Sequence, residues 1–314
     1  MNGILSLMQK FQERRIFFIL LGFWIVMIIW YPHEFLNPAV LKATILAMSS
    51  IAVIAVGMTV LLVSGGFDLS VGSTVTFTGV AAALLMKAGA PAILAIVAAI
   101  ICGMIIGFGN GIMIARLRIN PFITTLGMMI FIRGFATILS GGTNVPITNT
   151  AYTIIGQGSI GGIQIPIWVC LAFVITGDFL LRKSRYFRQN YYLGGNEKSA
   201  ILSGIPVSRL KIQNYMLSGA LASIAGIMLS ARLGNGSLTS GLNMEFKAVT
   251  AAIIGGCALT GGKGTVLGAF FGAMLMATID TAINIMPVDS YWQEFVTGIV
   301  LIFAIIIDSI GKKD

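Results

Sequence analysis

The chain has 314 residues, of which 57% are hydrophobic and 10% are charged, and its formal net charge is +9. Soluble globular domains carry roughly 25% charged residues, so this composition excludes that class and predicts an all-α, polytopic membrane protein. Three cysteines without CxxC spacing and a single histidine, His33, predict neither a disulfide framework nor a metal site.

Basic residues precede the first apolar segment. Lys10, Arg14 and Arg15 lie just before a predicted span over residues 16–30. Because Lys and Arg favour the cytoplasmic side of a membrane, the N-terminus is expected inside. A second span is predicted over residues 39–63.

A glycine break with an acidic residue follows in the run GGFDLSVGS, residues 65–73. The glycines permit an unwound turn, and Ser70 and Ser73 can cap a new helix. Asp68 either needs a partner or a water-filled cavity inside the membrane, or it caps a helix at the aqueous surface. An unpaired charge at the bilayer centre costs about 3 kcal/mol, and the sequence leaves both interpretations open.

Two further spans are predicted over residues 71–87 and 91–115, and the second contains Gly103, Gly107 and Gly111. Glycines four residues apart lie on one face of a helix and let another backbone approach closely. We therefore interpret this face as a helix-packing surface rather than as the lining of a pathway.

The next span, over residues 122–139, has a clear start and one internal charge. Asn120 can cap the helix, and Pro121 suits its first turn. Arg133 either pairs with a partner inside the bundle or extends outward to the interface, and the paired, structural role is favoured.

The only long polar interruption covers residues 182–213 and is expected in the cytoplasm. Within it Asn196 can cap a short helix, Glu197 suits the first turn, and Gly204 followed by Pro206 ends it.

This short helix carries apolar residues that are expected to face water. Ala200, Ile201 and Leu202 form a small apolar surface that would enter a groove on another protein. The alternative is a loop that folds back on the helices of its own chain.

A second glycine-rich run, GGCALTGGKGT over residues 255–265, follows a short predicted span at 248–254. Its spacing excludes a nucleotide-binding loop, because Cys257 replaces the first glycine and Gly264 stands where Ser or Thr is needed. A shift of 190 positions places the first break on this run: Gly65 on Gly255, Gly66 on Gly256, Ser70 on Thr260, and Asp68 on Ala258. Paired breaks in an internal repeat are typical of transporter pathways, and the repeat is either parallel or inverted.

Ten spans are predicted in all, the others covering residues 165–181, 208–231, a segment that ends near 285, and 295–307. The connections 141–164 and 232–247 are expected outside. The predicted inside segments hold 15 of the 20 Lys and Arg: Lys10, Arg14, Arg15, Arg116, Arg118, Arg182, Lys183, Arg185, Arg188, Lys198, Arg209, Lys211, Lys263, Lys312 and Lys313. The positive charge therefore reflects topology, and no nucleic-acid partner is predicted.

Several stretches resemble bacterial ABC importer permeases of the ribose, galactose and xylose branch. They are residues 65–73, residues 125–134 with TLGM and RG, residues 255–265, and the coupling-loop signature GGNEKSA at 194–200. In that family the coupling loop docks onto the ATP-binding subunit, so the resemblance implies an ATPase-coupling role for Glu197, Ala200, Gly204 and Ile205, with Ile201 beside them. It also implies a homodimer in the bacterial cytoplasmic membrane, a cytoplasmic ATPase and an extracytoplasmic sugar-binding protein.

The chain is therefore expected to form one transmembrane permease domain, 1–314, with both termini in the cytoplasm. It is expected to translocate a monosaccharide without a cofactor and without enzymatic activity of its own. The predicted pathway residues are Gly65, Gly66, Asp68, Ser70, Gly255, Gly256 and Thr260. A nucleoside or a signalling furanone derivative is the alternative solute; a stand-alone secondary transporter or channel and an intramembrane enzyme are the alternative classes.

Overall fold

The fold was obtained as a computed structural model that describes residues 2–286, 289 and 291–310. In this part of the chain the long helices run side by side, and short strands lie in the connections. The helices are α1 (Asn2–Trp30), α2 (Pro32–Phe35), α3 (Pro38–Val63), α4 (Val71–Lys87), α5 (Ala92–Ala115), α6 (Pro121–Ser140), α7 (Thr150–Gln157), α8 (Ile165–Lys183), α9 (Arg185–Gly195), α10 (Glu197–Leu202), α11 (Val207–Leu233), α12 (Met244–Ile254), α13 (Val266–Ile285) and α14 (Tyr291–Ile310). The strands are β1 (Val145–Pro146), β2 (Ser159–Ile160), β3 (Ile163–Gln164) and β4 (Asn235–Gly236), paired antiparallel as β1 with β4 and β2 with β3.

Asn–Pro pairs begin two of the long helices. The Asn37 side chain accepts a hydrogen bond from the backbone N–H of Ala39 at 2.9 Å, and Asn120 accepts one from Phe122 at 2.8 Å. The following proline occupies the first turn in both helices, where its missing N–H is not needed. The helix start predicted at Asn120 is thus confirmed.

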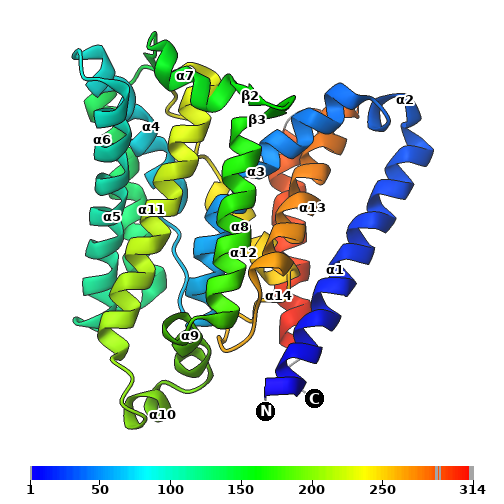
Figure 1. The fold of residues 1–314 in the computed structure, drawn as a ribbon, viewed down its shortest axis with the longest axis vertical. Coiled ribbons are helices and arrows are strands. Elements are labelled where there is room, and N and C mark those ends of the chain that lie inside the picture. Colours follow the sequence, from blue (N-terminus) through cyan, green and yellow to red (C-terminus); the bar gives the residue numbers. More distant parts are fainter. Residues whose placement is uncertain (1, 287–288, 290, 311–314) are drawn as a thin grey trace.

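The two ends of the bundle are different (Figure 1). One end carries α9 and α10, together with the start of α1 and the end of α14. The opposite end carries α2, α7 and the β2–β3 hairpin. The chain therefore passes from one end to the other several times.

The interior is built around α3 and α11. Helix α3 is buried along most of its length and packs against α11 and α13, and α11 packs against α4 and α5. A Cβ added at Gly107 would lie 2.1 Å from the carbonyl oxygen of Tyr215, and one at Gly103 would lie 2.4 Å from that of Gly219. The glycine face of α5 is therefore a packing surface, as predicted.

The ten predicted spans coincide with helices, which differ in length and apolar character. In the described residues six helices are long and apolar enough to cross a membrane: α3, α5, α6, α8, α11 and α13. Helices α4 and α12 have 17 and 11 residues, and a crossing needs roughly 20. The glycine breaks account for these short helices.

The connections predicted to lie outside hold more secondary structure than the sequence indicated. Helix α7 lies within the stretch 141–164, and its Tyr152 hydroxyl is 2.7 Å from the Ser230 hydroxyl of α11. The second connection, predicted over residues 232–247, is shorter than predicted, because α12 already begins at Met244. Glu245 and Lys247 therefore belong to a helix.

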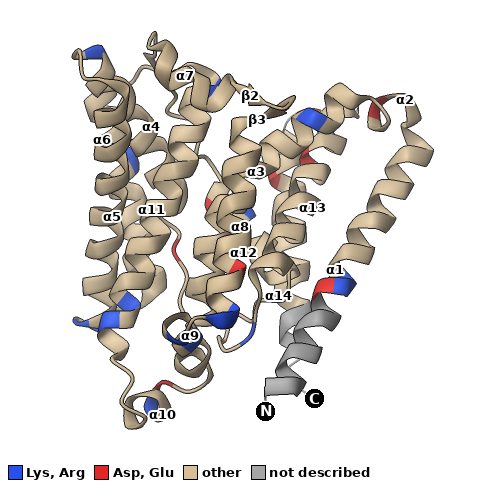
Figure 2. Ribbon diagram, in the orientation of Figure 1, with Lys and Arg blue, Asp and Glu red and all other residues tan. Residues whose placement is uncertain are grey.

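Basic residues gather at the end that carries α9 and α10 (Figure 2). The last turn of α5, the start of α6, the end of α8 and the start of α11 also lie at this end. Its basic residues include Arg116, Arg118, Arg182, Lys183, Arg185, Arg188, Lys198, Arg209 and Lys211. The side chain of Lys10 and all of Lys312 and Lys313, which the sequence also assigned to this side, lie outside the described part of the structure.

Candidate functional site

The first break turns the chain after α3. Gly65 has a φ of +82°, and the N–H groups of Gly65 and Gly66 donate to the carbonyls of Leu62 and Leu61, both at 2.9 Å. This arrangement is a glycine C-cap, which satisfies the last carbonyls of the helix. The chain then runs unwound to Val71, where α4 begins.

The second break repeats this turn after α12, with a shift of one position. Here Gly256 has the positive φ, +98°, and its N–H donates to the Ile253 carbonyl at 2.9 Å. Gly255 has an ordinary φ of −66°. In conformation Gly65 therefore corresponds to Gly256, which corrects the pairing with Gly255 that the sequence shift suggested. The second break is also longer, because α13 begins only at Val266.

The two breaks meet each other and the end of α9, within the polar stretch 182–213 that carries the predicted coupling loop; we call this stretch the coupling segment. The N–H of Gly262 donates to the carbonyl of Val63 at 2.9 Å. A Cβ at Gly261 would lie 2.8 Å from the Cα of Gly194 and 3.0 Å from that of Gly65. We call residues 63–66, 194–195 and 261–262 the glycine junction.

Gly194 leaves no space for a side chain in this junction. A Cβ at Gly194 would lie 2.0 Å from the Val63 carbonyl oxygen and 2.6 Å from the Gly262 nitrogen. Nearby, the hydroxyl of Tyr191 donates to the Gly264 carbonyl at 2.8 Å. A displacement of the coupling segment would therefore act directly on both breaks.

Asp68 is buried at the start of α4, where hydroxyl, amide and backbone groups surround it. Its Oδ1 accepts from the Ser70 backbone N–H at 2.9 Å and from the Ser70 hydroxyl at 2.6 Å. Asn110 and Ser218 add longer contacts of 3.4 Å each. Within the described residues it forms no ion pair.

This arrangement agrees with the interpretation of Asp68 as a buried residue with partners and not with a position at the aqueous surface. The side chain caps the turn into α4, but it does so inside the bundle rather than at the aqueous surface. Ser70 donates its hydroxyl to Asp68 and makes no side-chain cap bond of its own, contrary to the cap predicted for it. Two other predicted pathway residues, Gly65 and Thr260, are exposed, and a Cβ added at Gly65 would lie 3.9 Å from the Thr260 carbonyl oxygen.

The short helix α10 is capped at both ends. The Asn196 side chain accepts from the Ser199 N–H at 3.0 Å, as predicted. At the other end Gly204 has a φ of +78°, its N–H donates to the Ile201 carbonyl at 2.9 Å, and the Ile205 N–H donates to the Ala200 carbonyl at 3.1 Å. This bond pattern is the Schellman motif, which fixes the direction of the chain after the helix.

The apolar residues of α10 point in different directions. Ala200 is buried in a cluster with Leu193, Val207 and Leu210, so its predicted exposure is wrong. The reason is the cap itself, which brings Ile205 back against Ala200. Ile201 and Leu202 are 57% and 89% exposed and form the apolar surface that remains.

Charged residues surround this surface. Glu197 pairs with Lys211 of α11 at 2.8 Å, which ties the first turn of α10 to the bundle. Beside it lies a cleft of about 1240 Å³ between the α5–α6 connection and the α10–α11 region. Its basic lining residues are Arg116, Arg118, Lys198, Arg209 and Lys211.

Arg133 has a partner, as favoured from the sequence. Its guanidinium lies 3.6 Å from a carboxylate oxygen of Glu245, which is buried at the start of α12. Space for this carboxylate exists because residue 72 is glycine: a Cβ at Gly72 would lie 1.9 Å from Glu245 Oε2. Glu245 was not among the residues predicted from the sequence, because the stretch 232–247 was expected to be an outer connection.

Comparison with known proteins identifies the family. A family model described as "Branched-chain amino acid transport system / permease component" matches residues 40–305. The L-arabinose ABC transporter permease protein of Azospirillum brasilense is 35% identical over 280 residues, which are 89% of this chain and 83% of that protein.

Two ribose import permease proteins are similar to the same extent. That of Escherichia coli is 37% identical over 82% of this chain and 82% of its own length, and that of Bacillus subtilis is 36% identical over 88% and 86%. No solved structure matches the chain. The matched region contains both glycine breaks and the coupling segment. The chain is thus a multi-pass membrane protein and belongs to the family of transport-system permease components that includes these ABC transporter permeases.

Proposed function

We propose that this chain is the transmembrane permease subunit of an ATP-binding-cassette importer that carries a monosaccharide across the bacterial cytoplasmic membrane. The name of the family model mentions branched-chain amino acids, but relatives that are 35–37% identical over most of the chain are named for ribose and L-arabinose. A sugar is therefore the favoured solute. ATP hydrolysis takes place in a separate subunit.

The observation that carries the proposal is the doubly capped α10 with its exposed apolar end. Ile201 and Leu202 extend beyond the bundle on a helix that is held by Asn196 and Gly204. A stand-alone transporter has no use for such a surface, whereas an ATPase subunit can cover it.

The other coupling residues have supporting roles in this proposal. Ala200 and Ile205 anchor α10 to the bundle, and Glu197 orients it through Lys211. The basic cleft beside α10 would attract acidic residues of the ATPase and align the two subunits.

Transport requires that the docked ATPase subunit favours different conformations of the permease before and after ATP hydrolysis. The glycine junction supplies a mechanical connection, because Gly194 contacts the carbonyl that ends α3 and the loop that precedes α13. Movement of α10 would then tilt the helices that flank both breaks. We further propose that both breaks lie on the cytoplasmic side and that the repeat is parallel.

We also propose how the permease is oriented in the membrane and how it assembles. The basic end with α9 and α10 faces the cytoplasm together with both termini, and the end with α2 and α7 meets a sugar-binding protein outside. Two copies of the chain form the working permease, as the family resemblance implies.

The proposal is tested with Leu202→Asp in the full chain. The charge would be desolvated in the contact with the ATPase, so we expect loss of co-purification with the ATPase and at least about tenfold slower uptake of labelled ribose or arabinose. Membrane insertion should be unchanged, because Leu202 lies outside the bundle.

Ser159→Asp adds the same charge at the opposite end and should leave ATPase binding intact. Ala200→Asp serves as a second comparison: it places a charge in the buried cluster under α10 and should also lower stability. Sugar uptake by the purified chain alone, driven by an ion gradient and indifferent to Leu202→Asp, would overturn the importer assignment.

A further inference from the structure

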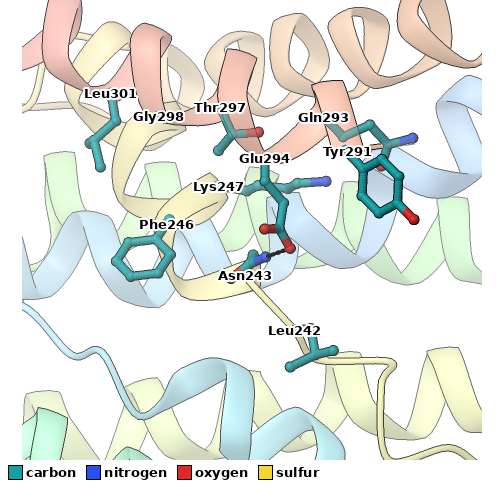
Figure 3. A pocket seen from close by; sticks show the side chains of 10 residues that line it. All are labelled: Leu242, Asn243, Phe246, Lys247, Tyr291, Gln293, Glu294, Thr297, Gly298 and Leu301. Atoms are coloured by element: carbon teal, nitrogen blue, oxygen red, sulfur yellow. Dashed lines mark hydrogen bonds between the residues drawn. The ribbon is translucent and has the colours of Figure 1, made fainter. Parts of the chain in front are cut away.

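A cavity of about 780 Å³ lies between α12 and α14, apart from the glycine junction (Figure 3). Polar side chains at the beginnings of both helices line it: Asn243 just before α12, Lys247 from α12, and Gln293, Glu294 and Thr297 from α14. Helix α14 ends near the α10 end of the bundle, so its first turns lie in the opposite half (Figure 1). We call this space the α12–α14 cavity.

The polar groups of the cavity retain hydrogen-bonding capacity. A Glu294 carboxylate oxygen accepts from the Asn243 amide at 2.8 Å, and the two side chains point toward each other in Figure 3. Among the residues that the structure describes, the other Glu294 oxygen and the Asn243 carbonyl oxygen have no donor. Lys247 uses one of its donors on Asp280 at 2.7 Å, which leaves further ones available.

Lipid is a poor occupant of this space. Hydrocarbon cannot bond to a carboxylate, an amide or an ammonium group, and such groups in membrane proteins face the bundle interior or a water-filled cavity. Phe246 and Tyr291 add apolar and aromatic surface to the same walls. Mostly apolar walls with a few placed polar groups are typical of small-molecule sites.

The charges of the cavity select among solutes. Asp280 neutralises Lys247, so the Glu294 carboxylate carries the uncompensated charge of the lining and repels an anion. A cation offers no acceptor to the remaining donors of Lys247. A neutral solute rich in hydroxyls avoids both disadvantages, because a hydroxyl donates to a carboxylate or amide oxygen and also accepts from an ammonium group. We infer that the α12–α14 cavity binds a neutral polyhydroxyl solute in the outer half of the permease, with Asn243 and Glu294 as its main hydrogen-bonding partners. This inference rests on the proposed function.

The first test asks whether the cavity is open to water. In a variant without the three native cysteines, Gly298→Cys places a thiol on the cavity wall, where an added Cβ meets open space. Phe295→Cys is the matched control, because this exposed residue of α14 lies one turn nearer the outer end and does not line the cavity. We expect a membrane-impermeant maleimide to label Gly298→Cys in intact cells at least about tenfold faster, since thiolate forms in water and not in hydrocarbon. Equal or slower labelling of Gly298→Cys would overturn the inference.

The second test removes the two hydrogen-bonding partners. Asn243 has a φ of +60°, so Asn243→Gly keeps the backbone unstrained, and Glu294→Gln keeps the shape of the side chain. We expect the double variant to take up labelled ribose or arabinose about tenfold more slowly at limiting sugar, because each lost hydrogen bond weakens binding severalfold. Binding of the ATPase should not change, and Glu34→Gln, which removes a carboxylate from α2, should have no effect.

The outcomes separate this inference from the proposed function. Parent-like uptake by the double variant would overturn the cavity assignment and leave the importer intact. ATP-independent uptake by the parent chain would overturn the importer and the inference with it.

Discussion

Individual residues determine how charged side chains are paired inside this bundle. Arg133 and Glu245 come from segments that are far apart in sequence, and their charged groups lie 3.6 Å apart with Glu245 buried. Removal of one partner from such a pair leaves the other charge without compensation inside the protein. Because Gly72 provides the space for the carboxylate, a residue of the first glycine break also contributes to this pair.

A double-mutant cycle should detect this dependence. We expect Glu245→Gln and Arg133→Gln each to lower the free energy of unfolding of the purified protein, and the double variant to lose less than their sum, with a coupling of about 1 kcal/mol or more. The exposed pair Glu197 and Lys211 is the control and should couple more weakly, since surface pairs contribute roughly 0–1 kcal/mol. Strictly additive losses at Arg133 and Glu245 would show that the pair does not interact.

At the scale of elements, the coupling segment and the two breaks form one contact. The backbones of the two breaks and the end of α9 approach closely because glycines stand at most of the contact points, and Gly194 lies at the centre. The backbone of the neighbouring Gly195 belongs to the junction, since a Cβ at Gly262 would lie 3.2 Å from the Gly195 Cα, but a Cβ added at Gly195 itself would meet no atom within 4 Å. Adjacent glycines of the same signature therefore have different roles.

The pair of variants Gly194→Ala and Gly195→Ala tests this difference. The Gly194 methyl group would clash with the Val63 carbonyl and the Gly262 nitrogen, so the segment must move away from both breaks. We expect Gly194→Ala to bind the ATPase and to slow uptake at least about tenfold, on the scale of overpacking costs of 1–3 kcal/mol. Gly195→Ala should transport at the parent rate. Equal uptake by the two variants would refute a transmitting role for the junction.

For the whole molecule, the uneven distribution of basic residues has a topological meaning. Lys and Arg concentrate at the end with α9 and α10, whereas the opposite end is formed by α2, α7 and short strands (Figure 2). The positive-inside rule assigns the basic end to the cytoplasm, which is also where an ATPase subunit would meet α10.

Cysteine labelling in intact cells tests this orientation. In the variant without native cysteines, we expect Ser184→Cys and Ser309→Cys to resist membrane-impermeant thiol reagents and Ser159→Cys in β2 to react. Ser309 has no described side chain, so its placement here follows from the sequence alone. Rapid labelling at Ser184→Cys together with protection at Ser159→Cys would reverse the topology.

Local chemistry in the sequence determined the helices, their caps and the class of protein. Composition required a membrane bundle, Asn120 and Pro121 determined a helix start, and Asn196 and Gly204 determined the ends of α10, because caps act within a few residues of the chain. The same motifs carried the family resemblance, which the comparisons bear out.

Contacts between distant segments were decided only by the tertiary structure. The burial of Ala200, the partnership of Arg133 with Glu245, the correspondence of Gly65 with Gly256 and the α12–α14 cavity each depend on how helices are placed against one another. A sequence states which residue carries a small or charged side chain, but the neighbours that such a side chain meets belong to other elements. Glycine shows this most clearly: Gly194 and Gly195 are equivalent in the chain and differ only in what surrounds them after folding.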